Sequence, residues 1–141
     1  MPVRSLNSSV IKWPDAETVD LAVRRWAERY SKDRPGVVRI GYFGSYARGN
    51  WSVGSDLDLI VIVKSSKRPF IDRPSEWDTT DLPVHADLLV YTKDEWESLM
   101  SQRRSYQNLA REVIWVYIRD ETYIPEPMEG MNVKTLKRSN V

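Results

Sequence analysis

Hydrophobic residues recur at helical spacing near the start of the chain. Between positions 15 and 32 they fall three or four residues apart, and most charged residues take the other side; the apolar set is Val19, Ala22, Val23, Trp26, Ala27 and Tyr30. This spacing predicts an amphipathic helix over about 15–32. Asp15 suits the N-cap because its carboxylate can accept from free backbone N–H groups. Pro35-Gly36 is expected to end the helix, since proline cannot continue it.

Three later segments are rich in β-branched, aliphatic and aromatic residues and predict strands. They cover residues 37–43, 57–63 and 84–91. The second is apolar along almost its whole length, which favours a central strand of a sheet. Residues 64–83 carry three prolines and many charges, so a long loop is expected there.

The last third of the chain predicts one helix and one ambiguous element. Thr92 and Glu95 have the spacing of a capping box, in which each side chain satisfies a free backbone N–H. A helix is therefore expected over about 93–112, with a break near 101–105. The apolar residues 113–118 fit either a strand or a buried helix end. This order of elements predicts an α/β (α+β) fold with a single sheet.

The length of 141 residues fits one domain covering residues 1–141. Residues 1–14 predict an irregular lead-in, and residues 120–141 predict a loose tail. The longest apolar run is far shorter than the ~20 residues of a membrane span, and the N-terminus lacks the apolar core of a signal peptide. A cytoplasmic protein without a membrane partner is therefore expected.

Composition excludes several kinds of site. The chain has no cysteine and one histidine, which excludes disulfide frameworks, thiol catalysis and zinc sites built from several cysteines or histidines. Lysine and arginine number 21 against 20 aspartate and glutamate, a net charge of +1. Because nucleic-acid-binding domains are usually more basic, no direct nucleic-acid binding is expected.

Candidate chemistry begins where the first predicted strand ends. Gly44-Ser45 follows that strand and leads into a short segment that contains Arg48. Glycine lets backbone N–H groups approach a phosphate, and the start of a helix adds partial positive charge. Ser45 and Arg48 add further donors for a triphosphate. An ordinary strand-to-helix turn has the same residues, so both interpretations stay open on this segment alone.

Two carboxylates stand at the start of the second predicted strand. Residues two apart on a strand point to the same face. Asp56 and Asp58 are therefore expected together, while Leu57 and Leu59 point into the core. Carboxylates this close repel each other and suit Mg²⁺. The alternative is a pair of exposed acids at a strand end.

A third carboxylate, Asp87, lies within the third predicted strand among apolar residues. A carboxylate in such a place is costly unless it is paired or metal-bound. If this strand lies beside the second, Asp87 can join Asp56 and Asp58, and three carboxylates can hold two Mg²⁺ ions about 3.5–4 Å apart for in-line phosphoryl transfer. Pairing of Asp87 with a surface arginine is the alternative. His85 shares the face of Asp87 and could reach the site, although a lone histidine is more commonly a packed or surface residue.

In their order and spacing these residues resemble the signature of the nucleotidyltransferase (DNA polymerase β-type) superfamily. The matching residues are Gly44-Ser45-x-Ala47-x-Gly49, then Ser55-Asp56-x-Asp58-Leu59, then Asp87. The resemblance covers about 37–91, and the compact chain is most similar to the minimal nucleotidyltransferase group. It implies a nucleotidyltransferase fold, a mixed β-sheet flanked by helices. It also implies a nucleotide-binding segment formed by Gly44, Ser45, Arg48, Gly49 and Ser55, and catalytic, metal-binding roles for Asp56, Asp58 and Asp87.

The resemblance further implies a reaction and a partner. A hydroxyl would attack the α-phosphate of a nucleoside triphosphate, ATP in the first instance, with one or two Mg²⁺ ions and release of pyrophosphate. The minimal group resembles the antitoxin half of toxin–antitoxin pairs, whose partner is a helical HEPN ribonuclease, and some members add AMP to a toxin tyrosine.

Three functions stay open on the sequence. The alternatives are an adenylyltransferase that acts on a partner protein by AMPylation, an antitoxin that acts by binding alone, and a small-molecule nucleotidyltransferase of the aminoglycoside type. For the last of these, a homo-oligomer could complete the acceptor cleft.

Overall fold

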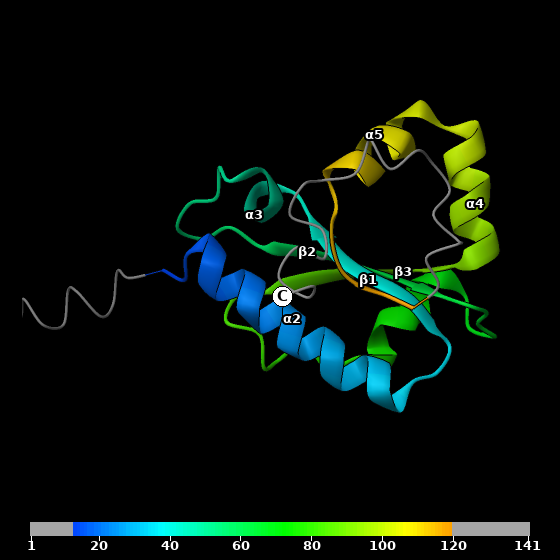
Figure 1. The fold of residues 1–141 in the computed structure, drawn as a ribbon, viewed down its shortest axis with the longest axis horizontal. Coiled ribbons are helices and arrows are strands. Elements are labelled where there is room, and N and C mark those ends of the chain that lie inside the picture. The colour runs from blue at the N-terminus through cyan, green and yellow to red at the C-terminus, as the bar shows by residue number, and fades with distance from the viewer. Residues whose placement is uncertain (1–12, 120–141) are drawn as a thin grey trace, which may run out of the picture.

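The computed structural model describes residues 13–119. The expected tail, and the expected lead-in up to residue 12, lie outside them. The elements in chain order are α2 (Ala16–Asp33), β1 (Val37–Phe43), α3 (Ser45–Arg48), β2 (Leu57–Val63), the 3₁₀ helix η1 (Phe70–Glu76), β3 (Ala86–Thr92), α4 (Lys93–Gln102), α5 (Arg104–Glu112) and β4 (Ile114–Ile118). Figure 1 shows α2 on one side of the sheet and α4 and α5 on the other. The expected sheet flanked by helices is confirmed.

The four strands form one mixed sheet in the order β3-β2-β1-β4. β1 is antiparallel to both β2 and β4, whereas β2 and β3 are parallel. β2 is thus an interior strand, as predicted. In this arrangement the end of β1 and the starts of the other three strands meet at one end of the sheet.

Alternation along β2 divides the core between the two faces of the sheet. Leu57 and Leu59 are fully buried in the core on the α2 side, and Ile60 and Ile62 are fully buried in the core on the α4–α5 side. Because alternate residues share a face, Asp58 belongs to the α4–α5 face. The predicted separation of the leucines from the carboxylates is confirmed.

Polar contacts fix the first helix at its start and against the sheet. The Asp15 carboxylate accepts from the Thr18 backbone N–H at 2.8 Å, as expected of an N-cap. One turn further on, the buried Asp20 accepts from the Tyr42 hydroxyl at 2.8 Å and pairs with Arg24 at 2.9 Å. These bonds hold α2 to β1 and satisfy a carboxylate that would be costly to bury alone.

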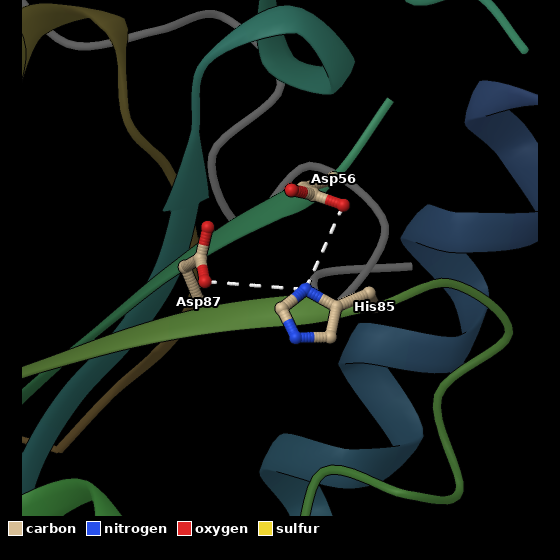
Figure 2. A group of neighbouring side chains, drawn as sticks. All are labelled: Asp56, His85 and Asp87. Atoms are coloured by element: carbon tan, nitrogen blue, oxygen red, sulfur yellow. Dashed lines mark ion pairs between the residues drawn. The ribbon is translucent and has the colours of Figure 1, made fainter. Parts of the chain in front are cut away.

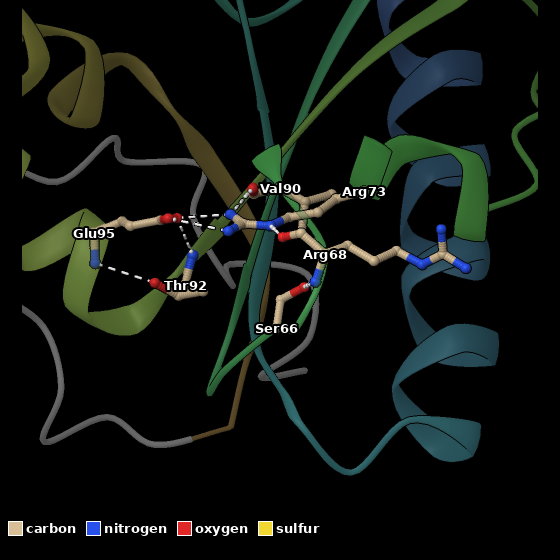
Figure 3. A network of polar contacts seen from close by, with 6 residues as sticks. All are labelled: Ser66, Arg68, Arg73, Val90, Thr92 and Glu95. Atoms are coloured by element: carbon tan, nitrogen blue, oxygen red, sulfur yellow. Dashed lines mark hydrogen bonds and ion pairs between the residues drawn. The ribbon is translucent and has the colours of Figure 1, made fainter. Parts of the chain in front are cut away.

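The segment 64–83 is more ordered than the predicted loop, because it contains η1. Arg73, on η1, is 5% exposed and donates to the Val90 carbonyl at 3.0 Å and to the Glu95 carboxylate at 2.7 and 3.0 Å (Figure 3). This buried guanidinium joins the crossover, which is the segment between β2 and β3, to both β3 and α4. Hydrophobic periodicity gives no signal for such a contact, which explains the error.

The remaining predictions agree closely with the structure. The capping box of Thr92 and Glu95 is formed, and the helical region breaks at Arg103 between α4 and α5. The ambiguous residues 113–118 form β4, because that segment pairs with the free edge of β1. Within residues 13–119, none of the helices has the length and apolar character that crossing a membrane requires.

Candidate active site

The starts of β2 and β3 bring the candidate carboxylates together. In the parallel register Asp58 lies opposite Asp87. The Leu57 N–H donates to the His85 carbonyl at 2.8 Å, which ties the first residue of β2 to the residue just before β3. Asp56 and His85 therefore flank the same end of the sheet (Figure 2). The side-by-side placement of the two strands, on which the meeting of the carboxylates depends, is confirmed.

His85 lies between two of the carboxylates. Its Nδ1 atom is 3.6 Å from Asp56 Oδ1 and 3.9 Å from Asp87 Oδ1 (Figure 2). One ligand atom from each of the three residues falls within 4.8 Å of the others. In an octahedral Mg²⁺ site with bonds of about 2.1 Å, neighbouring ligands are about 3.0 Å apart and opposite ligands about 4.2 Å apart. The separations of 3.6 and 3.9 Å lie between these two values, and the three groups together could hold a metal ion.

Asp58, expected beside Asp56 and Asp87, lies deeper and outside this group of three. Burial raises the pKa of Asp58, and the charges of Asp87 and Asp56 raise it further, whereas Arg48 lowers it. A carboxylate in this position gains from a nearby cation, because the cation offsets both the repulsion and the lost hydration. The donor set therefore fits a hard divalent ion.

Gly44 forms the turn that follows β1, and no other residue suits its position. Its φ of +82° lies in the region that L side chains rarely adopt. A Cβ added there would also collide with the Asp58 carboxylate. The glycine therefore lets the backbone pass directly beside Asp58, and it is buried against that residue.

The remaining motif residues shape the segment between β1 and β2. Ser45 begins α3, and Gly49, at a φ of +85°, ends it by donating to the Ser45 carbonyl at 2.9 Å. The Ser55 hydroxyl accepts from the Ser52 N–H at 2.8 Å. Because α3 has only four residues, the partial positive charge expected at its N-terminus is small. The donors of this segment are individual groups: the Gly44 N–H, the Ser45 hydroxyl and the Arg48 guanidinium.

Aromatic packing holds this segment in place. The Trp51 ring stacks on Tyr46 with centroids 5.7 Å apart and 9° between the planes. The Trp13 indole N–H donates to the Tyr46 hydroxyl at 2.8 Å. The buried Tyr46 is thus fixed from both sides, which anchors α3 to the α2 side of the core.

Glu112, at the end of α5, is a further acid of this region that sequence reasoning missed. Its Oε1 atom accepts from the Gly44 N–H and from the Arg48 guanidinium, each at 3.1 Å. Glu112 is 68 positions from Gly44 in sequence and belongs to none of the recognised motifs. Only the closure of β4 onto β1 brings it to the site.

The family assignment agrees with this geometry. Residues 23–115, more than half of the chain, match the nucleotidyltransferase domain family. The chain belongs to this family. The matched span contains all the candidate residues from Gly44 to Glu112, so the end of the sheet described above lies within the nucleotidyltransferase domain.

Two solved structures are similar to this nucleotidyltransferase domain. A Sulfolobus solfataricus protein provisionally classed as a nucleotidyltransferase aligns with a TM-score of 0.54 and 17% identity, over 74% of this chain and 84% of its own. This similarity supports the fold. A toxin–antitoxin protein solved with AMP-PNP aligns with a TM-score of 0.40 and 15% identity, over 71% of this chain and 77% of its own. No curated protein matched the sequence significantly.

Proposed function

We propose that this nucleotidyltransferase domain, taken as one minimal unit over residues 1–141, transfers AMP from ATP to a hydroxyl of a partner protein in a Mg²⁺-dependent reaction. The proposed partner is a helical HEPN ribonuclease toxin, and the chain is its antitoxin. The observation that carries the transfer reaction is the meeting of Asp56, Asp58 and Asp87 with the Gly44-Ser45 turn at one end of the sheet. The partner rests on the resemblance to minimal nucleotidyltransferases.

Each group has a role that its position supports. Asp56 and Asp87 are exposed, with Asp58 behind them, and together they would hold the cation. Bound there, Mg²⁺ would supply neutralisation of the triphosphate and polarisation of the attacking hydroxyl. The Gly44 N–H, the Ser45 hydroxyl and the Arg48 guanidinium would donate to the phosphate oxygens.

The bond changes balance without a further reactant. The acceptor hydroxyl oxygen forms a bond to the α-phosphorus, and the bond between that phosphorus and the bridging oxygen to the β-phosphate breaks. Pyrophosphate leaves with the bonding electrons, and a site carboxylate, for which Asp87 is the candidate, takes the hydroxyl proton. The product is a phosphodiester between the acceptor and AMP.

Transfer of label from each of the four α-labelled nucleoside triphosphates tests the proposal. The wild-type chain is incubated with Mg²⁺, with and without the helical partner, beside the Asp56→Ala, Asp58→Ala double variant. Asp81→Ala is the matched control, because Asp81 is an exposed carboxylate of the crossover that pairs with Arg29 at 3.4 Å. We expect label on the partner from ATP with wild type and the control, and a loss of at least a hundredfold in the double variant.

Two other outcomes of this experiment would favour the two alternative functions. A tight complex with the partner but no label under any condition would leave an antitoxin that acts by binding. With an aminoglycoside added to the same incubation, label on it and none on protein would assign a small-molecule transferase.

A further inference from the structure

Glu112 takes up two of the donors that the proposed function gives to a nucleotide. One carboxylate oxygen, Oε1, accepts from both the Gly44 N–H and the Arg48 guanidinium at 3.1 Å. A phosphate oxygen is the same kind of acceptor, an oxygen with negative charge. Because a backbone N–H directs its hydrogen at one strong acceptor, the Gly44 N–H cannot serve Glu112 and a phosphate at once.

The surrounding charge disfavours the joint presence of Glu112 and a triphosphate. Glu112 lies close enough to Asp58 for its charge to act on that group, and the charges of Asp56 and Asp87 act on Asp58 as well. A triphosphate would bring several more negative charges to the same place. Like charges at this separation repel strongly when they are partly buried.

The position of Glu112 allows it to withdraw. It is the last residue of α5, and 29% of its side chain is exposed. Part of the side chain therefore already faces water at the end of the helix. Of the two donors that it would leave, the Gly44 N–H lies on a turn, and the Arg48 guanidinium belongs to an exposed side chain.

We propose that Glu112 is an internal stand-in for a phosphate: it holds the Gly44 N–H and Arg48 when no nucleotide is present, and it withdraws when a nucleoside triphosphate binds. The identity of the ligand rests on the proposed function. The contact itself weakens nucleotide affinity, because binding must first break two hydrogen bonds to a charged oxygen.

Affinity for ATP with Mg²⁺, measured by calorimetry on the full chain, tests this inference. Glu112→Ala removes the contact and the charge, while Glu112→Asp keeps the charge on a side chain one methylene shorter. Glu97→Ala, at an exposed position on α4, is the control for loss of a distant carboxylate. We expect both Glu112 variants to bind ATP about tenfold more tightly than wild type, the order expected for release of a charged hydrogen bond, and the control to be unchanged.

Weaker or unchanged binding in Glu112→Ala would overturn the inference, since Glu112 would then position its donors for phosphate or have no part in binding. Tighter binding in Glu112→Ala but not in Glu112→Asp would show that the carboxylate weakens binding by charge repulsion alone. This result would also overturn the inference. Absence of ATP binding in every variant would also overturn it.

Label transfer in the same preparations separates the two proposals. Tighter binding in both Glu112 variants with no transfer in any preparation would support the stand-in and reject the transfer reaction. Transfer by wild type together with weaker ATP binding in Glu112→Ala would support the transfer reaction and reject the stand-in. In ¹⁵N-labelled protein, the Gly44 amide resonance gives a check without nucleotide: it should move in Glu112→Ala and not in Glu97→Ala.

Discussion

Gly44 shows how one residue can decide whether the site forms. A Cβ at this position meets two separate costs, a backbone conformation with φ of +82° and a collision with the Asp58 carboxylate. Gly54 has a φ of +90° but open space around it. The two positions therefore separate backbone strain from the close approach to Asp58.

We predict that Gly44→Ala destabilises the protein much more than Gly54→Ala. The Gly54 variant should lose about 1–2 kcal/mol, the cost of a left-handed L-residue, and the Gly44 variant should lose at least about 2 kcal/mol more because Asp58 must move. Denaturant unfolding of both variants measures the difference. Equal losses would show that Asp58 can move aside at no cost.

The Asp58 carboxylate lowers the stability of the fold at the position where the proposed function needs its charge. Its carboxylate is partly buried beside Asp87 and Asp56, and burial is the largest of the causes that raise its pKa. We predict that Asp58→Asn raises the melting temperature in the absence of divalent ions while abolishing transfer, because the amide removes the repulsion at nearly the same size. Asp81→Asn, which changes an exposed acid, is the control. A lower melting temperature for Asp58→Asn in EDTA would contradict this.

The alternation of a strand predicts the positions of some residues of the candidate site and not of others. Alternation places Asp58 on the face opposite Leu57 and Leu59, whereas Asp87 comes near it only because β3 pairs with β2 in parallel register. The same pattern does not fix the orientation of His85, whose ring lies between Asp56 and Asp87. Glu112 reaches Gly44 only through tertiary folding, so no local pattern could identify it.

At the scale of elements, the strands that pack on both faces were predicted with correct bounds, and the segments held by polar contacts were not. β1 and β2 are apolar runs with clear ends, and the structure places them at the predicted residues. Residues 113–118 were ambiguous because five or six apolar residues fit a strand or a helix end. The pattern of residues 64–83 predicts a loop and misses η1, because η1 depends on Arg73, a charged residue that is buried only through its partners.

The pair formed by Arg73 and Glu95 predicts a pH-dependent contribution to stability. The hydrogen bonds from Arg73 lower the pKa of Glu95 from its ordinary value of 4.5, while partial burial opposes this change. Because the folded protein holds the proton on Glu95 less tightly than the unfolded chain does, the contribution is complete above pH 4.5 and is lost as the pH falls through the lower folded-state pKa.

We predict that Glu95→Gln lowers stability by about 1 kcal/mol at neutral pH, a modest loss because water reaches the exposed part of Glu95. The difference between wild type and the variant should shrink as the pH falls below 4.5. Unfolding by urea at a series of pH values measures it, with Glu97→Gln on the same helix as the control. A difference that stayed constant from pH 7 to pH 3 would exclude the ion pair as its source.

At the scale of the whole molecule, the mixed sheet is what assembles the site. Antiparallel pairing of β1 with β2 and β4, and parallel pairing of β2 with β3, brings four distant chain segments to one end of the sheet. Among the described residues 13–119, Asp56, His85 and Asp87 lie at this end of the sheet and are exposed. The candidate site therefore depends on the fold for its geometry.

Divalent ions should stabilise the whole domain if these groups bind them. An ion that binds only the folded state adds RT ln(1 + [ion]/Kd), about 2.7 kcal/mol at a hundred times the Kd. We predict that Mg²⁺ raises the melting temperature of the wild-type chain by several degrees and has no effect on an Asp56→Asn, Asp87→Asn double variant. Asp81→Asn should respond as wild type does.

His85 should make the stabilisation by divalent ions depend on which ion is bound. Imidazole nitrogen favours Ni²⁺ and Co²⁺ over Mg²⁺, which prefers oxygen ligands. Since Nδ1 of His85 lies 3.6 and 3.9 Å from the two carboxylates, His85→Ala should lose most of the stabilisation by Co²⁺ and keep that by Mg²⁺. The visible absorption of bound Co²⁺ reports the same ligand change without any assay of activity. Equal loss for both ions would mean that His85 supports the carboxylates without binding the metal, and retention of both would place its ring outside the metal site.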